Sequence, residues 1–280
     1  MLKVLEEAGI RPDYIVGTSI GAVVGGLYAA GFSASELEQM FTQQQWISLI
    51  TDRRDDLGNE PYKVKDGITY IFGFPVLDNN SPTIGLLQGA RVEQVIDSMM
   101  AIKGCVEFDC MPTPFRCVAA SMLNAEEVVL QDGTIPKAIR ASMAIPGVFK
   151  PVEIDGEQLV DGGMMNNLPV DIAREMGADI VIAVDLQQNK PQNRQQQPDN
   201  ILISIANSLG FGAIVNWVVN RPDITKYNEN RQHCDIYINP PLPDDDATSF
   251  GNASMTHMIE VGQMAARQQF TRLRQLARPE

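Results

Sequence analysis

The hydrophobic and polar positions at the start of the chain predict a helix, a short strand and a second helix in close succession. Residues 1 to 8 read as the end of an amphipathic helix, with Gly9 as its C-terminal cap. Residues 12 to 16 predict a short strand, and the small residues 19 to 30 predict a helix that Gly31 ends. The resulting order is strand, tight turn, helix.

Beyond this start, helical and strand patterns alternate along the chain. The predicted elements are a helix from Ser33 or Ser35, strands at 115–120 and 127–130, a helix at 135–142, strands at 152–154 and 159–161 joined by an Asp155-Gly156 turn, a helix from Pro169 to Gly177, a buried strand at 180–184 and an amphipathic helix at 257–276. Helices that alternate with such strands predict a three-layer α/β domain.

Three segments depart from this alternation. Residues 51–81 are irregular and predict a variable insertion, as a hairpin or a lid, or a plain surface excursion. Residues 187–200 are rich in Gln, Asn and Pro and predict a polar loop. Residues 201–220 carry no charge, but their polar side chains favour a core helix over a membrane span. We expect residues 1–280 to form a single domain.

Composition narrows the classes of partner. The chain has 280 residues, of which 44% are hydrophobic and 20% charged, enough for a large buried core. Its formal net charge of -13 repels phosphate backbones, so we expect no nucleic acid partner. A lipid surface would be met through apolar contact.

Cysteine and histidine are scarce and match no metal pattern. The chain has 4 cysteines and 2 histidines, and the cysteine spacings fit no zinc motif. We interpret Cys105, Cys110, Cys117 and Cys234 as buried or idle thiols. Asp244, Asp245 and Asp246 favour a solvated loop over a metal site. We therefore expect no metal and no cofactor.

A G-x-S-x-G sequence lies between the first predicted strand and its helix. Its residues are Gly17, Thr18, Ser19, Ile20 and Gly21. A nucleophile elbow needs this context, because the serine sits in a strained turn and the flanking glycines let strand and helix approach. The turn also places the serine at a helix N-terminus, where the Ile20 amide can stabilise a developing oxyanion.

A serine nucleophile needs a base, and the sequence offers two kinds. His233 or His257 would serve in a Ser-His-Asp triad, but only 18 residues precede the serine, which is early for an α/β-hydrolase elbow. The alternative is Asp161, at the end of a predicted strand and followed by Gly162 and Gly163, which allow another backbone or a substrate to come close.

Longer stretches resemble the bacterial patatin-like phospholipases. The runs are GTSIGA, AIRASMAIPGVFKPVEIDGEQLVDGG and NNLPVDIAREMGADIVIAVDL, and the resemblance spans most of the chain. It implies a central, mainly parallel sheet between helices and a calcium-independent lipid acyl hydrolase without a catalytic histidine. The family's Ser-Asp dyad carries over to Ser19 and Asp161. The expected partner is a lipid or acyl-ester substrate, with transient contact to a membrane surface.

One departure from the family pattern concerns the start. The family opens with a strand and a Gly-rich loop that supplies the main oxyanion donors, whereas this sequence starts inside the following helix. We expect the chain as printed to lack these donors and to hydrolyse esters weakly.

Two other functions stay open: a catalytically impaired binding or scaffold domain, and a Ser-His-Asp esterase. A cytoplasmic location is favoured, with a periplasmic or membrane-associated one open if a targeting segment lies upstream.

Overall fold

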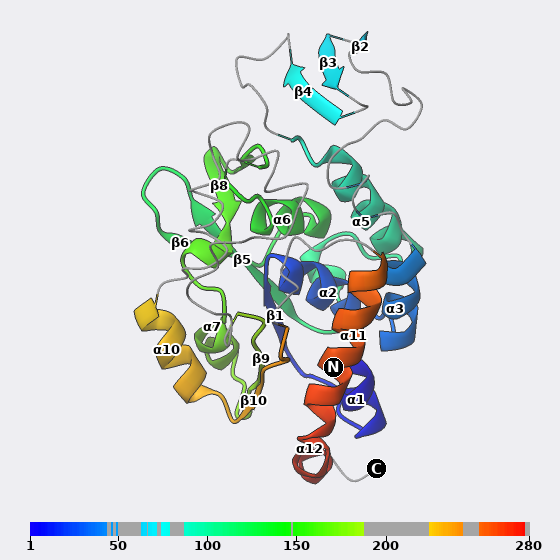
Figure 1. The fold of residues 1–280 in the computed structure, drawn as a ribbon. Coiled ribbons are helices and arrows are strands. Elements are labelled where there is room, and N and C mark those ends of the chain that lie inside the picture. Colours follow the sequence, from blue (N-terminus) through cyan, green and yellow to red (C-terminus); the bar gives the residue numbers. More distant parts are fainter. Residues whose placement is uncertain are drawn as a thin grey trace.

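The computed structural model describes ten stretches of the chain. They are residues 1–43, 46, 49, 63–65, 67–71, 74–78, 87–146, 148–187, 224–242 and 252–277. Within them, a central sheet lies among helices, as Figure 1 shows, and the predicted three-layer α/β/α fold is confirmed. The predictions for residues 188–200, 201–220 and 244–246 lie outside these stretches.

The central sheet has five strands in the order β1-β5-β8-β7, with β6 also paired to β5. Their bounds are β1 Ile15–Thr18, β5 Phe115–Ser121, β6 Glu127–Leu130, β7 Val152–Ile154 and β8 Glu157–Asp161. Strand β1 pairs with β5 in parallel, and the register places Gly17 opposite Cys117. The other pairings, β5 with β6, β5 with β8 and β7 with β8, are antiparallel.

The antiparallel half of the sheet follows from tight turns. Asp155 and Gly156 join β7 to β8 with φ angles of 52° and 82°, as the predicted two-residue hairpin requires. A short turn with Ala125 at φ 55° joins β5 to β6. Since a tight turn can join only antiparallel neighbours, the parallel order expected from the resemblance holds for β1 with β5 but not for β6, β7 and β8.

Three helices close the core, and two of them pack directly on the sheet. They are α2 (Ile20–Ala29), α5 (Ala90–Ile102) and α6 (Ile135–Ser142). Helix α2 contacts β1 and β5, α6 contacts β5 and β8, and α5 packs on α6. The large, fully buried side chains between them include Leu27, Ile96, Met100, Ile139 and Phe149. The elements that carry the predicted site therefore border the main hydrophobic core.

A second group of helices lies beside α2. It comprises α1 (Leu2–Glu7), α3 (Ala34–Gln43), α11 (Asn252–Arg267) and α12 (Phe270–Leu276). Helix α11 contacts both α1 and α3, so the two ends of the described chain pack together. The Ser33 hydroxyl accepts a hydrogen bond from the Glu36 amide at 3.2 Å and caps α3. The helix predicted at 257–276 is in fact two helices, because a turn at residues 268–269 separates α11 from α12.

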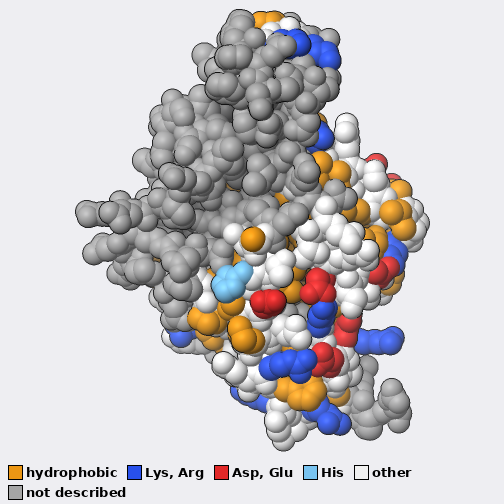
Figure 2. Space-filling view, turned by 45° about the vertical axis from the view of Figure 1, so that its right-hand side comes forward, with side chains coloured by type: hydrophobic (Ala, Val, Ile, Leu, Met, Phe, Trp, Pro, Cys, Tyr) orange, Lys and Arg blue, Asp and Glu red, His pale blue; other side chains and the backbone are white. Residues whose placement is uncertain are grey.

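Basic and acidic side chains alternate on the face that α11 presents. Figure 2 shows Lys, Arg, Asp and Glu side chains next to one another on this face. Two ion pairs account for part of the pattern: Lys3 with Glu38, and Arg267 with Glu7, the latter at 2.9 Å between Nη2 and Oε2. These pairs are partly exposed, so each contributes little to stability. The net negative charge is not gathered into one patch on this face.

A third group of helices and strands lies beside β1. It consists of α7 (Val170–Glu175), β9 (Ile182–Val184), α10 (Ile224–His233) and β10 (Ile236–Ile238). Strands β9 and β10 pair in parallel, α7 contacts β1, and α10 contacts α7. The sequence predicted β9 two residues longer, but Ile180 lies before the strand and is half exposed. The sequence did not predict α10 or β10.

The segment predicted as an insertion contains a small sheet of its own. Strands β2 (Lys63–Lys65), β3 (Ile68–Ile71) and β4 (Phe74–Asp78) pair in antiparallel order, and Figure 1 shows them beyond the end of α5. The hairpin prediction is confirmed for these residues, and the lid stays a prediction. Among the described helices, none is both long enough and apolar enough to cross a membrane.

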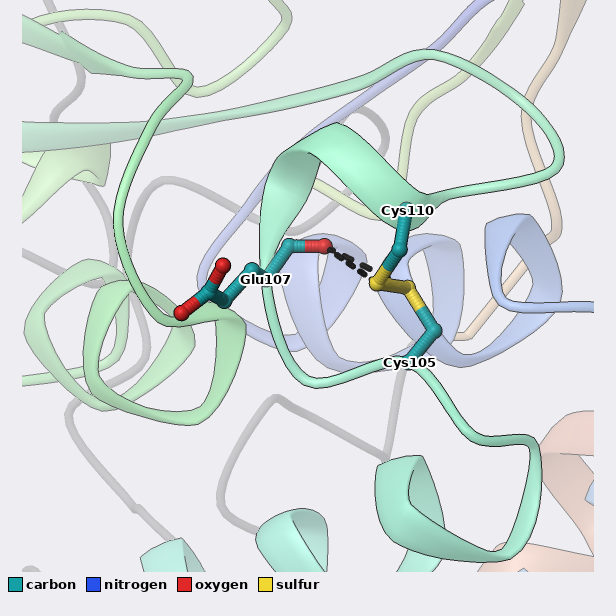
Figure 3. Close-up of a disulfide and its surroundings, with 3 residues drawn as sticks. All are labelled: Cys105, Glu107 and Cys110. Carbon is teal, nitrogen blue, oxygen red and sulfur yellow. Dashed lines mark hydrogen bonds between the residues drawn. A yellow bond between two sulfur atoms is a disulfide. The ribbon is translucent and has the colours of Figure 1, made fainter.

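The cysteine interpretation is wrong for two of the four residues. Cys105 and Cys110 form a disulfide that closes a short loop around the 3-10 turn η2 (Phe108–Cys110), just before β5 (Figure 3). Their separation of five residues gave no motif to recognise, and the bond depends on how the loop folds back. Cys117 is a free and buried thiol, as expected, and burial raises its pKa. Cys234 is free and half-buried.

Candidate active site

Ser19 lies in the sharp turn between β1 and α2, as the G-x-S-x-G pattern predicted. It is the N-cap residue of α2, with φ 54° and ψ -120°, a backbone conformation that residues with a side chain rarely adopt. Such a conformation costs on the order of 1 to 3 kcal/mol and persists only where the surroundings impose it. Ser19 is partly exposed.

The two glycines of the pattern have different roles. A Cβ atom on Gly17 would lie 2.3 Å from the Gly21 carbonyl oxygen, so only glycine fits where β1 meets the first turn of α2. A Cβ atom on Gly21 would meet no atom within 4 Å. The prediction that both positions must be small is therefore confirmed for Gly17 and wrong for Gly21, which contributes its backbone carbonyl to the contact.

Asp161 ends β8 and is directed toward the same turn. Its side chain is 3% exposed, and its carboxyl group accepts a hydrogen bond from the Gly163 amide at 2.7 Å. Burial raises the pKa of Asp161 from 3.8 to about 6, and interactions with the Ser19 hydroxyl and the Gly163 amide oppose that rise. The carboxyl group is thus ionised at neutral pH and is more basic than an exposed aspartate.

Gly162 and Gly163 begin the 3-10 turn η3 (Gly162–Met164) and let the chain pass close to β5. A Cβ atom on Gly162 would lie 2.2 Å from the Val118 carbonyl oxygen. One on Gly163 would lie 3.0 Å from both Asn167 Oδ1 and Asp161 Oδ1. The expectation that a neighbouring backbone comes close is confirmed for Gly162, where that backbone is β5, whereas Gly163 lies against two side chains.

The remaining residues of the elbow also have defined contacts. Thr18 is buried, and its hydroxyl donates a hydrogen bond to the Asn166 carbonyl at 2.8 Å, which ties the elbow to the segment after Asp161. Within the described residues, the amides of Ile20 and Gly21 donate to no partner. They lie in the first turn of α2, where the helix dipole favours negative charge. The Ile20 amide is therefore an available donor, as predicted.

The two histidines belong to other parts of the fold. His233 ends α10, where its carbonyl accepts a hydrogen bond from Arg174 Nη2 at 2.9 Å. His257 lies in α11, which packs on α1 and α3. The Ser19 hydroxyl interacts with the Asp161 carboxyl group instead. This geometry favours the aspartate over a histidine as the base.

Sequence analysis did not identify one residue at the site, Ser142 at the end of α6. Its hydroxyl oxygen accepts a hydrogen bond from the Ser19 amide at 2.9 Å. The two residues are 123 positions apart, so no local pattern links them. The only signal was that Ser142 lies within one of the stretches that resemble the patatin-like phospholipases.

Comparison with known proteins identifies the family. A family model described as patatin-like phospholipase matches residues 1–174. An uncharacterized NTE family protein of Mycobacterium tuberculosis is 34% identical over 186 residues, which are 66% of this chain and 44% of that protein. Human patatin-like phospholipase domain-containing protein 6 is 34% identical over 188 residues, 66% of this chain and 12% of its own length. The chain belongs to the patatin-like phospholipase family, and it matches less than half the length of these relatives.

Proposed function

We propose that this chain is a serine acyl hydrolase that cleaves carboxylic esters of lipids with Ser19 as nucleophile and Asp161 as base. The observation that carries the proposal is that a partly exposed serine in a strained elbow interacts with a buried carboxylate at the end of β8. Family membership supports the class of reaction. The names of the relatives support a lipid substrate.

In the proposed first step, the Asp161 carboxylate accepts the Ser19 proton while Ser19 Oγ attacks the ester carbonyl carbon. The carbonyl oxygen takes the negative charge, which the Ile20 amide and the α2 dipole stabilise. When the tetrahedral intermediate collapses, the alcohol leaves with the proton from Asp161, and the acyl group stays on Ser19.

The second step releases the acid. Asp161 accepts a proton from a water molecule, whose oxygen attacks the acyl-enzyme carbonyl. Collapse of this intermediate breaks the bond to Ser19 Oγ, which recovers the proton from Asp161, and the fatty acid departs. Replacing that water by another acceptor would make the same site an acyl transferase.

Residues 1–280 form a single patatin-like domain in this proposal, and residues 51–81 are its variable segment, where substrate choice would be set. The substrate is an acyl ester with an apolar chain, which the protein meets by transient contact with a lipid surface. No cofactor takes part in either step.

Four variants test the assignment on p-nitrophenyl esters. Ser19→Ala and Asp161→Asn should each lose nearly all turnover, because residues that act as one unit give losses that do not add. His233→Ala and His257→Ala are the matched controls and should retain it. If a histidine variant were inactive and Asp161→Asn were active, a triad would be indicated instead. A folded wild-type chain without Ser19-dependent turnover on any acyl ester would favour a binding or scaffold domain.

A further inference from the structure

We propose that Ser142 is a positioning residue that holds the Ser19 elbow in register with Asp161. The inference rests on the proposed roles of those two residues and adds the element that sets their relation, the C-terminal end of α6. Ser142 itself faces the backbone of Ser19 and would not touch the reacting atoms.

The hydroxyl of Ser142 makes two hydrogen bonds in opposite senses. It donates its proton to the Val118 carbonyl at 2.6 Å and accepts from the Ser19 amide at 2.9 Å. Because the Ser142 hydroxyl proton is donated to β5, a lone pair of the hydroxyl oxygen can accept the hydrogen bond from the elbow. The side chain is fully buried, at 0% exposure, so water cannot readily replace either bond.

The same end of α6 also holds Asp161. Two residues after Ser142, the Ala144 carbonyl accepts a hydrogen bond from the Asp161 amide at 2.9 Å. Residues 142–144 therefore bind the backbone of the proposed nucleophile through a side chain and that of the proposed base through a carbonyl. Val118 of β5 contacts both α6 and the segment after Asp161. Its carbonyl accepts a hydrogen bond from Ser142 and lies against Gly162.

The Ser19 amide needs such a partner for a local reason. It precedes the first turn of α2, where amides have no intrahelical acceptor, and Ser19 has the strained φ of 54°. Without the Ser142 hydroxyl, the amide loses the bond that opposes relaxation of the elbow. A shift of about 1 Å in a reacting group can lower the rate by about 10²-fold.

The chain offers a matched control in Ser121. Its side chain is 2% exposed and belongs to β5, the strand that Ser142 contacts. Its hydroxyl has no hydrogen-bond partner among the described residues. Ser121→Ala and Ser142→Ala therefore each remove one buried hydroxyl from the same region, but only Ser142→Ala removes the link to Ser19.

The test compares kcat and KM on a p-nitrophenyl ester for wild type, Ser121→Ala, Ser142→Ala and the nearly isosteric Ser142→Cys. We expect both Ser142 variants to lose about 10- to 100-fold in kcat with KM little changed, because the lost contact acts on the nucleophile and not on the substrate. Ser142→Cys keeps the volume and provides only a weak acceptor, so it serves if the alanine variant does not fold. Ser121→Ala should retain kcat.

A second readout is independent of turnover. Hydrogen exchange of the Ser19 amide should be about tenfold faster or more in the Ser142 variants than in Ser121→Ala, because the amide loses its acceptor. Both Ser142 variants with kcat and Ser19 exchange close to those of Ser121→Ala would overturn the inference. Absence of Ser19-dependent turnover in wild type would instead overturn the proposed function, and exchange would still report the anchoring.

Discussion

At the scale of a single residue, the Asp161 carboxyl group has a proposed catalytic role and an effect on stability. Because burial raises its pKa from 3.8 to about 6, the folded state binds this proton more tightly than the unfolded state does. The stabilisation of the folded state by this bound proton is complete below about pH 4 and is lost as the pH rises through about 6. At neutral pH the ionised carboxylate lowers the free energy of unfolding.

Asp161→Asn should therefore stabilise the protein while abolishing its activity. At pH 8 we expect a free energy of unfolding higher by up to about 3 kcal/mol, because the amide keeps the acceptor for the Gly163 amide and carries no buried charge. At pH 4 the difference should be small. Urea unfolding at the two pH values measures it, and an asparagine variant that is less stable at pH 8 would contradict the assigned burial cost.

Gly17 and Gly21 give a second comparison at this scale. Gly17→Ala should destabilise the fold by at least about 2 kcal/mol, since the new Cβ would lie 2.3 Å from a backbone oxygen. Gly21→Ala has free space and lies in a helix, where alanine is favoured by up to about 1 kcal/mol. Thermal unfolding of both variants checks the order. Equal losses would show that the close approach of β1 and α2 is described incorrectly.

At the scale of elements, the sequence predicts those helices and turns whose position depends on nearby residues. Helix α6 and the β7–β8 hairpin occur where predicted, because Pro136 lies in the first turn of the helix and Asp155-Gly156 forms the turn of the hairpin. Sheet order, the Ser142 contact and the Cys105–Cys110 bond depend on segments meeting in space. The pattern of apolar positions did not predict α10, because most residues of this helix are polar and its buried residue is Asn230.

The disulfide loop before β5 provides a prediction for an element. Titration of the unfolded protein with a thiol reagent should find the two free cysteines, Cys117 and Cys234, and all 4 after reduction. Because the bond spans only five positions, reduction should cost about 2 kcal/mol of stability at most. Ester turnover should persist after reduction. Four reactive thiols without reductant would contradict the bond.

At the scale of the whole molecule, the net charge bears on the proposed contact with a lipid surface. The net charge of -13 opposes approach to anionic membranes, and acidic side chains lie among the basic ones on the face that Figure 2 shows. Contact with lipid would then depend on apolar groups. The composition thus favours uncharged or zwitterionic surfaces.

Hydrolysis of vesicle-borne esters should show this preference. With anionic vesicles we expect the rate to rise as salt increases from about 0.01 to 0.15 M, because the Debye length falls from about 30 to 8 Å. With zwitterionic vesicles of the same ester content the rate should change little. A rate on anionic vesicles that falls with salt would indicate a basic docking surface elsewhere on the molecule.

The central claim is that Ser19 is a nucleophile activated by Asp161, and covalent labelling tests it most directly. A fluorophosphonate should form one adduct, mapped by mass spectrometry to Ser19, at a rate that rises with pH through about 6 as Asp161 loses its proton. Asp161→Asn should label far more slowly at every pH, although it folds. Labelling of another serine, or a rate at Ser19 that is equal in the asparagine variant, would contradict the account.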